Sequence, residues 1–276
     1  MRIALIQQQP GPHRDENVRR GLDAVREAAG RGAKLAAFPE LAFTPFFPSG
    51  RCGGPLPLDL AETVPGPTSD AFARLAADLG IVLVLNLYER EGVRAFDSSP
   101  VIDADGRLLG TTRMLHIAQM PHFYEQEYYA PGDHGMPVYD TAAGRIGVAI
   151  CYDRHYPEVM RSLGLQRADL VVIPQAGTAG EWPDGLYEAE LRVAAFQNGY
   201  YTALANRVGD EPGMTFAGES FVCDPAGRVI ARGPAAAEAI VYADVDLGTT
   251  ASCHARRLFL RDRRPELLPS LLLFDG

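Results

Sequence analysis

The stretch RIGVAICYDRHYPE, from Arg145 to Glu158, combines a buried strand, a thiol and the start of a helix. Its apolar half, Ile146 to Ile150, leads directly into Cys151. Polar residues follow, and then Pro157, which suits the first turn of a helix. The pattern predicts a thiol held at a sharp strand-to-helix junction. Backbone N–H groups at such a junction can point at the target of a nucleophile, so Cys151 is a candidate nucleophile.

Short apolar runs recur outward from this stretch, with helix-like segments between several of them. The other runs are Ile3–Ile6, Leu35–Phe38, Ile81–Leu87, Val101–Ile102, Leu170–Ile173, Tyr201–Ala205, Ser220–Val222 and Ile240–Ala243. Helical periodicity is found in Asn17–Ala29, Ser69–Leu79, Pro157–Leu165 and Leu186–Gln197. The turn sequences Asp103–Arg107 and Asp224–Arg228 predict hairpins. Strands that mix with both helices and hairpins predict an α/β fold with a mixed sheet.

Composition narrows the class of protein. The 276 residues are 47% hydrophobic and no linker divides them, which predicts a single domain over residues 1–276. No apolar run reaches the length of a membrane span, and we expect no cleavable signal at the N-terminus. The net charge of −9 argues against nucleic acid and anionic membrane surfaces as partners.

The cysteines and histidines lack the spacings of metal sites. Four cysteines are widely separated without a CxxC pair, and six histidines form no HxxxH pair, so we expect no metal. No phosphate-binding glycine motif is present, and we expect no cofactor. Free cysteines without a signal predict a reduced, cytoplasmic protein. For Cys151 alone, a buried structural cysteine is the alternative interpretation, and it is the favoured one for Cys52, Cys223 and Cys253.

Glu40 is the second candidate for chemistry. It ends the apolar run LAAFPE, from Leu35 to Glu40, and sites in α/β proteins gather at the carboxyl ends of strands. A carboxylate that is partly desolvated there has a raised pKa, which suits a general base. A solvated glutamate at a strand end is the alternative interpretation.

Taken together, these blocks resemble the nitrilase, or carbon–nitrogen hydrolase, superfamily over nearly the whole chain. The similar stretches are Phe38–Glu40, Arg113–Ile117, Phe123–Asp133, Gly144–Glu158, Ala203–Gly209 and Phe216–Gly227. Their order and spacing are most similar to the branch that contains N-carbamoylputrescine amidases and β-ureidopropionases. The resemblance implies a four-layer α-β-β-α sandwich of nitrilase type with mixed sheets. It also implies a homodimer, or a higher homo-oligomer, with the C-terminal tail of about residues 250–276 reaching the partner.

The resemblance also implies residue roles. Glu40 matches the family's general base, Cys151 its nucleophile and Glu125 its second glutamate. In the family mechanism the base takes the thiol proton, the thiolate attacks an amide-type carbonyl, and water hydrolyses the resulting thioester. The backbone N–H of Tyr152 would be one donor to the oxyanion, and a lysine would be the other.

The chain departs from this pattern at the lysine. The family reads Arg-Lys-x-His-Ile-Pro where the chain reads RMLHIA, so Met114 occupies the lysine position. Lys34 is the only lysine in the sequence, and it opens the strand that leads to Glu40, about 20 Å from the catalytic end. Loss of one oxyanion donor typically costs about 10²–10³ in rate. Two carboxylates and a thiol would then share a pocket without a balancing cation, which pushes them toward their protonated forms.

Several side chains are candidates to replace the lysine or to line the substrate pocket. Arg113 should face away if Met114 faces the site, because neighbouring residues on a strand point to opposite faces. Arg154 and His155 are better placed, although ion pairing and helix entry are alternative roles. The predicted substrate-binding residues are His116, Tyr124, Arg154, Thr178 and Trp182. For the histidine and the aromatic residues, packing in the core is the alternative.

Three functions remain open from the sequence. The first is hydrolysis of a C–N bond in a small linear amide or N-carbamoyl amine. The second is a catalytically impaired family member that binds a ligand or partner through the old pocket. The third is acyl transfer from the same thioester to another acceptor. Intact Glu40, Cys151 and Glu125 favour the first and third, whereas Met114 favours the second. In each catalytic case, Cys151 and Glu40 are expected to lie side by side.

Overall fold

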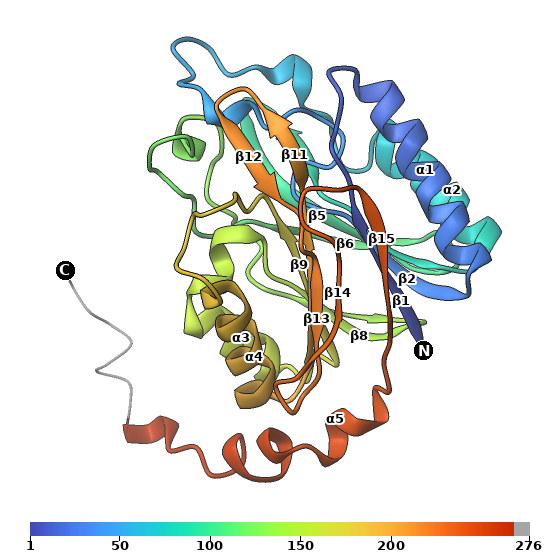
Figure 1. Cartoon of the computed structure of the whole chain (residues 1–276), viewed down its shortest axis with the longest axis vertical. Helices are drawn as coiled ribbons and strands as arrows, with labels where there is room; N and C mark the ends of the chain where they lie inside the picture. Colours follow the sequence, from blue (N-terminus) through green and yellow to red (C-terminus); the bar gives the residue numbers. More distant parts are fainter. Residues whose placement is uncertain (268–276) are drawn as a thin grey trace.

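Two β-sheets pack face to face in the computed structural model, and helices cover their outer faces (Figure 1). The structure describes residues 1–267. The first sheet has the order β15 (Ala239–Asp244), β1 (Arg2–Gln7), β2 (Ala33–Ala37), β3 (Val82–Val84), β5 (Arg94–Ile102) and β4 (Leu87–Glu91), and β6 (Leu108–Arg113) also pairs with β5. The second sheet has the order β14 (Val229–Arg232), β13 (Phe221–Cys223), β10 (Tyr201–Asn206), β9 (Leu170–Gln175), β8 (Gly144–Val148) and β7 (Val138–Thr141). A separate hairpin joins β11 (Val208–Glu211) to β12 (Met214–Ala217).

Three apolar clusters define four layers. The central cluster joins inward residues of both sheets, such as Leu5 and Leu35 on one and Val148 and Val172 on the other. The outer face of the first sheet packs against α1 (Arg14–Gly30) and α2 (Pro67–Leu79). The outer face of the second packs against α3 (Pro157–Leu165) and α4 (Leu186–Asn198). The expected α-β-β-α sandwich is confirmed.

Strand direction places the carboxyl ends of the central strands together. In the first sheet β1, β2 and β3 run parallel, and in the second β8, β9 and β10 run parallel. The remaining pairs are antiparallel, so both sheets are mixed, as predicted. The two predicted turns are confirmed as the links between β5 and β6 and between β13 and β14. The N–H of Glu40 donates to the carbonyl of Gln175 at 3.4 Å, which brings the ends of β2 and β9 together.

The apolar run Ile81–Leu87 differs from the expected single strand. It divides into β3 and the first residue of β4, because Asn86 interrupts the apolar run and its side chain makes hydrogen bonds of its own. Conversely, the short run Val101–Ile102 is only the end of the nine-residue β5. The earlier part of β5 carries buried polar residues, which hide it from a search for apolar runs.

The C-terminal segment runs along the end of the helical layer of α3 and α4 (Figure 1). It contains α5 (Gly248–Ser252) and the short turns η5 (Ala255–Phe259) and η6 (Pro265–Leu267). The last part of the predicted tail, residues 268–276, lies outside the described residues. Within residues 1–267, none of the helices has the length and apolar character needed to cross a membrane.

Candidate active site

Cys151 is the first residue of η4 (Cys151–His155), the single turn between β8 and α3. Its φ of 43° lies in the left-handed region, which residues other than glycine rarely adopt. A conformation of this kind costs about 1–3 kcal/mol and persists only where the surrounding structure holds it. The side chain is 6% exposed, and its Sγ accepts a hydrogen bond from Nε2 of Gln175 at 3.2 Å. The turn therefore fixes the thiol at one point inside the protein.

Glu40 follows β2 and is completely buried. The guanidinium of Arg207 fixes this loop by donating to the backbone carbonyls of Glu40 and Leu41 at 2.9 and 2.6 Å. The carboxyl of Glu40 lies close enough to the Cys151 thiol for each group to act on the pKa of the other, although neither oxygen of Glu40 has a hydrogen-bond partner within residues 1–267. Burial, followed by the charges of Asp97 and Glu125, raises the pKa of Glu40 well above its ordinary value. Its thiol neighbour acts in the opposite direction.

Glu125 joins the same site from η3 (Glu125–Glu127). It is completely buried, and its Oε2 accepts a hydrogen bond from the N–H of Ala118 at 3.2 Å. Burial first, and then the charge of Asp97, raises the pKa of Glu125. Burial also raises the pKa of the Cys151 thiol, with further contributions from Glu40 and Glu125. The thiol and its two neighbouring glutamates thus all favour their protonated forms.

Met114 directly follows β6 and is completely buried in the apolar cluster that includes Cys151. Its N–H donates to the backbone carbonyl of Asp97 at 2.9 Å. A thioether carries no charge and donates no hydrogen bond, so Met114 supplies neither function of a lysine. Lys34 is exposed at the start of β2. The site's carboxyls are therefore balanced neither by residue 114 nor by the chain's single lysine.

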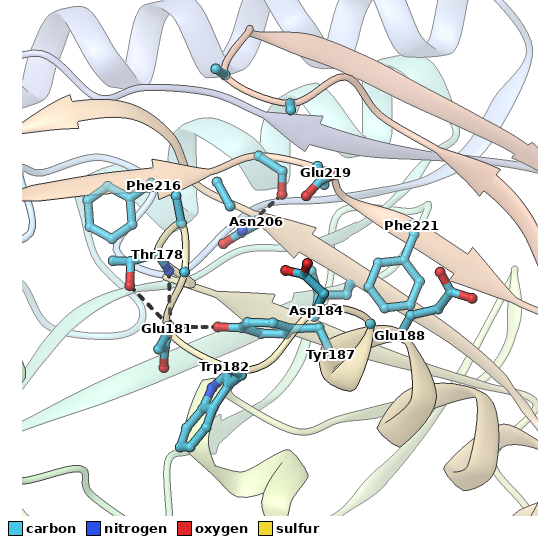
Figure 2. Close-up of a pocket in the computed structure, with 18 of the residues that line it drawn as sticks. Thr178, Glu181, Trp182, Asp184, Tyr187, Glu188, Asn206, Phe216, Glu219 and Phe221 are labelled. Carbon is cyan, nitrogen blue, oxygen red and sulfur yellow. Dashed lines mark hydrogen bonds between the residues drawn. The ribbon is translucent and has the colours of Figure 1, made fainter.

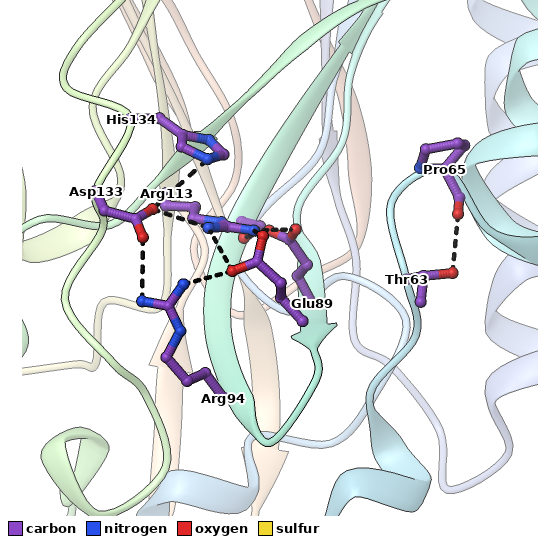
Figure 3. Close-up of polar contacts among 9 residues, drawn as sticks. Thr63, Pro65, Glu89, Arg94, Arg113, Asp133 and His134 are labelled. Carbon is purple, nitrogen blue, oxygen red and sulfur yellow. Dashed lines mark hydrogen bonds and ion pairs between the residues drawn. The ribbon is translucent and has the colours of Figure 1, made fainter.

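Arg113 lies in a network of ion pairs with Glu89 and Asp133 (Figure 3). Its side chain is 2% exposed and pairs with Glu89 at 2.6 Å and with Asp133 at 2.8 Å. The guanidinium carbon also lies 3.9 Å from the ring centroid of Phe96. This network joins β6 to β4 and to the segment after Ala130. The charge of Arg113 is paired with these carboxylates, on the face of β6 opposite to that of Met114.

Arg154 is the cation that acts on the thiol. Its side chain is buried, and Nη1 donates to the backbone carbonyl of Cys151 at 3.4 Å. Its charge lowers the pKa of the thiol, although burial and the two glutamates outweigh it. Glu190 on α4 holds this region through His155 Nδ1 at 2.8 Å and Arg154 Nε at 3.4 Å. Both candidates to replace the lysine contact the Glu190 carboxylate, and Arg154 in addition donates to the backbone carbonyl of Cys151.

His116 and Tyr124 are half-buried at the edge of the site. His116 Nδ1 lies 2.8 Å from the buried carboxylate of Asp153, and its ring stacks on Tyr156 with 3.5 Å between centroids. Asp153 also accepts hydrogen bonds from the N–H groups of Leu115 and His116, so it joins the nucleophile turn to the segment after Met114. The Tyr124 ring is covered by the guanidinium of Arg51 at 4.4 Å. Both side chains have packing partners in addition to any substrate role.

Thr178 and Trp182 line a cavity of about 300 Å³ that neighbours the site of the thiol (Figure 2). The Glu181 carboxylate fixes the loop by accepting hydrogen bonds from the N–H of Thr178 at 3.0 Å and from the hydroxyl of Tyr187 at 2.7 Å. Tyr187 links the two places, because it lines the cavity and its ring lies 4.4 Å from the Arg154 guanidinium. The lining of this cavity does not include Cys151.

The arrangement matches proteins of known activity. The profile of the carbon–nitrogen hydrolase family matches residues 2–255. The chain is 32% identical to an N-carbamoylputrescine amidase from Arabidopsis thaliana, over 91% of this chain and 88% of the relative. It is 30% identical to a citrullinase from Francisella tularensis, over 99% and 98% of the two chains. The chain belongs to the carbon–nitrogen hydrolase family.

Solved structures agree with this assignment. A carbon–nitrogen hydrolase from Helicobacter pylori superposes with a TM-score of 0.90 at 29% identity, over 99% of both chains. An amidase from Nesterenkonia sp. superposes with a TM-score of 0.83 at 26% identity, over 98% of this chain and 99% of that one. That structure carries acrylamide added to the active-site cysteine. The protein is therefore a carbon–nitrogen hydrolase of the amidase or carbamoylase type, which acts on amides or carbamoyl compounds.

Sequence reasoning missed several residues of this hydrolase site. Asp97 is completely buried beside Glu40, in the part of β5 that carries buried polar residues. Gln175 ends β9 in the same way that Glu40 and Cys151 follow their strands, and this position was a usable signal. Asn86 and Tyr187 gave no such signal, because their roles depend on contacts between distant segments.

Proposed function

We propose that this hydrolase cleaves a small N-carbamoyl amine or a small linear amide through a thioester on Cys151. The observation that supports this most strongly is the burial of Glu40, Glu125 and Cys151 at one point, where the ends of β2 and β8 meet. The names of two relatives, N-carbamoylputrescine amidase and citrullinase, favour the carbamoyl compounds.

In this mechanism Glu40 acts as the general base. It takes the proton of the Cys151 thiol as the sulfur attacks the carbonyl carbon, since burial keeps the thiol protonated at rest. The oxyanion accepts a hydrogen bond from the N–H of Tyr152, one of the first N–H groups of η4, which lack partners within that turn. The leaving amine or ammonia takes a proton from Glu40. Water then attacks the thioester, Glu40 receives the water's proton, and the thiol is restored.

Glu125 is proposed to orient the substrate amide from the other side of the site. Arg154, His116 and Tyr124 are proposed to contact the rest of the substrate, with Thr178 and Trp182 shaping the loop that closes over it. Because Met114 supplies no donor, turnover is expected to be about 10²–10³ slower than with a lysine at this position. The same absence favours a second candidate function, that of an impaired family member that binds its ligand without releasing a product.

A substrate panel separates these functions. The protein is incubated with N-carbamoyl amines, ureido acids and primary amides, and ammonia release is measured beside intact mass. We expect ammonia release together with an acyl adduct that maps to Cys151. Cys151→Ser should abolish both signals, whereas Cys223→Ser, at a buried cysteine remote from the site, should abolish neither. An adduct without release would indicate the impaired member, and decay only with an added amine would indicate acyl transfer. Neither adduct nor release across the panel would contradict the proposal.

We also propose a cytoplasmic homodimer formed through the layer of α3 and α4. Exposed apolar side chains gather there, including Val193 and Phe196 on α4 and Phe259 on η5, and the rings of Phe196 and Phe259 lie 5.3 Å apart. An apolar surface of this kind is typical of an interface. Light scattering coupled to size exclusion should give twice the chain mass, and Val193→Glu should convert it to the monomer mass. A monomeric parent protein would contradict this part.

A further inference from the structure

Asp97 lies beside Glu40 in the active site and is not part of the mechanism above. It lies in β5, where Phe96 and Ser98 point to the Arg113 network on the opposite face. The Asp97 side chain is completely buried. Its Oδ1 accepts a hydrogen bond from Nδ2 of Asn86 at 2.6 Å, and its Oδ2 has no partner among residues 1–267.

Asn86 holds Asp97 against Glu40. The Oδ1 of Asn86 accepts a hydrogen bond from the N–H of Leu41 at 2.7 Å, while its Nδ2 donates to Asp97. One amide therefore joins the residue after Glu40 to the carboxyl of Asp97. The two carboxyls lie close enough for each to act on the pKa of the other, and both oxygens of Glu40 and Oδ2 of Asp97 have no hydrogen-bond partner within residues 1–267. Since neither is a donor when ionised, they form a hydrogen bond only when a proton lies between them.

The charges around this pair favour such a proton. Two adjacent buried carboxylates cannot both ionise without a large electrostatic cost. The titratable and charged groups that face the pair are Glu125, Tyr129, Cys151, Asp153 and, through the thiol, Arg154. Four of these five are acids. Both oxygens of Glu40 and Oε1 of Glu125 also lack partners within the described part of the chain. Burial raises the pKa of Asp97 to about 7.

A bound metal ion is another way to balance the negative charge of a cluster of buried carboxyls. Among residues 1–267, no group of three or more histidine, cysteine, aspartate or glutamate side chains is arranged to hold a metal ion.

We propose that Glu40 and Asp97 share one proton, so that the pair carries one negative charge and not two. Asp97 is then a positioning residue for the general base, and the shared proton takes the place of a balancing lysine. This inference rests on the proposed role of Glu40. A single negative charge is then spread over two carboxyls, and the site needs no ammonium group to keep that charge low.

The proton balance follows from this arrangement. At rest the pair carries one proton and one negative charge. When the Cys151 sulfur bonds to the carbonyl carbon, the thiol proton passes to Glu40, and the negative charge moves from the pair to the substrate oxygen. When the C–N bond breaks, Glu40 gives a proton to the leaving nitrogen and the oxygen re-forms its double bond. The pair returns to one proton and one charge, ready to take the proton of the hydrolytic water.

Asp97→Asn separates this role from simple packing. An asparagine fits the same space, keeps an acceptor for Asn86 and can donate to Glu40, but it cannot ionise. For the parent protein we expect kcat/KM to fall at high pH as the shared proton is lost. In Asp97→Asn that alkaline limb should move up by at least about one pH unit or disappear. Ser99→Ala is the matched control, because Ser99 also contacts Nδ2 of Asn86, at 3.1 Å, without a charge. It should leave the alkaline limb in place.

A second measurement does not depend on turnover. A native state that holds an extra proton loses stability as pH rises, by about tenfold in the folding equilibrium constant per pH unit for each proton. Between pH 5 and the pH at which the pair ionises, Asp97→Asn should reduce this slope by about one proton, and Ser99→Ala should not. Equal slopes in a folded Asp97→Asn would overturn the proposal. If no substrate is turned over but the slope changes, the pair stands and the proposed reaction fails.

Discussion

The Nε2 of Gln175, the last residue of β9, donates a hydrogen bond at 3.2 Å to the Sγ of Cys151, the first residue of η4. The amide stabilises a thiolate more than a thiol, since hydrogen bonds to charged groups are the stronger ones. Burial and two glutamates raise the pKa of the thiol, whereas the charge of Arg154 lowers it. A donor that favours the thiolate acts in the same direction as Arg154.

Gln175→Leu should therefore make the thiol less reactive. Loss of a hydrogen bond to a charged group costs about 1.5–3 kcal/mol, so alkylation of Cys151 at pH 8 should slow by roughly ten- to a hundredfold. The rate is read by peptide mapping after timed treatment with iodoacetamide. Gln166→Leu, at the end of α3, is the matched control and should leave the rate unchanged. An unaltered rate in Gln175→Leu would mean that the amide only packs against the sulfur.

Met114→Lys should raise turnover of a carbamoyl or amide substrate, or at least increase alkylation of Cys151 at neutral pH. The new ammonium would balance Glu40 and Glu125 and add a donor to the oxyanion, an effect of up to about 10²–10³ in rate. Steady-state ammonia release measures it. Met114→Leu keeps an apolar side chain of similar volume and should give no gain. If neither readout improves in a folded Met114→Lys, the pocket is organised around methionine.

Glu125→Gln should lower the pKa of the Cys151 thiol, because the charge of Glu125 raises it. Alkylation at pH 7 should become faster, since a larger fraction of the thiol is ionised, while turnover should fall because glutamine offers the substrate amide one acceptor oxygen where glutamate offers two. The rate of alkylation against pH should shift toward lower pH. Glu127→Gln, at the far end of the same turn and paired with Arg51, should shift neither quantity. A shift of the profile toward higher pH would contradict this assignment of the charges.

Arg113→Ala should destabilise the fold rather than alter the chemistry directly. Removing one partner of a buried ion pair costs about 3–5 kcal/mol, because Glu89 would be left buried without its cation. Urea unfolding measures the change. Arg113→Lys should recover only part of it, since an ammonium cannot make the two parallel hydrogen bonds to Glu89 that Arg113 makes at 2.9 and 2.6 Å. If Arg113→Ala unfolds with the same free energy as the parent protein, the ion-pair network does not stabilise the fold.

Much of this structure was predictable because apolar runs end at functional positions. The runs before Glu40 and Cys151 predicted two buried strands, and each residue lies three positions beyond the last residue of its strand. The helix Pro157–Leu165 was predicted with its bounds, because a proline begins it and its apolar residues recur with helical spacing. Asp97 was not predicted, since β5 carries buried polar residues whose partners lie on other strands. Local patterns report burial, whereas the pairing of Asp97 with Glu40 depends on tertiary contact.

Thr178 and Trp182 illustrate a second limit. Both residues were predicted to bind substrate, but the cavity that they line has Tyr187 on the side of Arg154 and does not include the thiol in its lining. Loop sequence predicts exposure and turns, and it does not determine which of two neighbouring cavities a side chain faces.

The register of β6 has a consequence for how this enzyme can change. Arg113 pairs opposite Ser98 in β5, and the next N–H, that of Met114, bonds to the carbonyl of Asp97. A slip of one residue would carry the guanidinium into the catalytic face, but it would strip Glu89 of its partner and expose the apolar methionine to a cluster of ions. The register of β6 is therefore fixed, and the positive charge of Arg113 lies one residue before Met114, the position at which the family has a lysine. Restoring that charge requires a substitution at residue 114 and cannot be achieved by rearranging the chain.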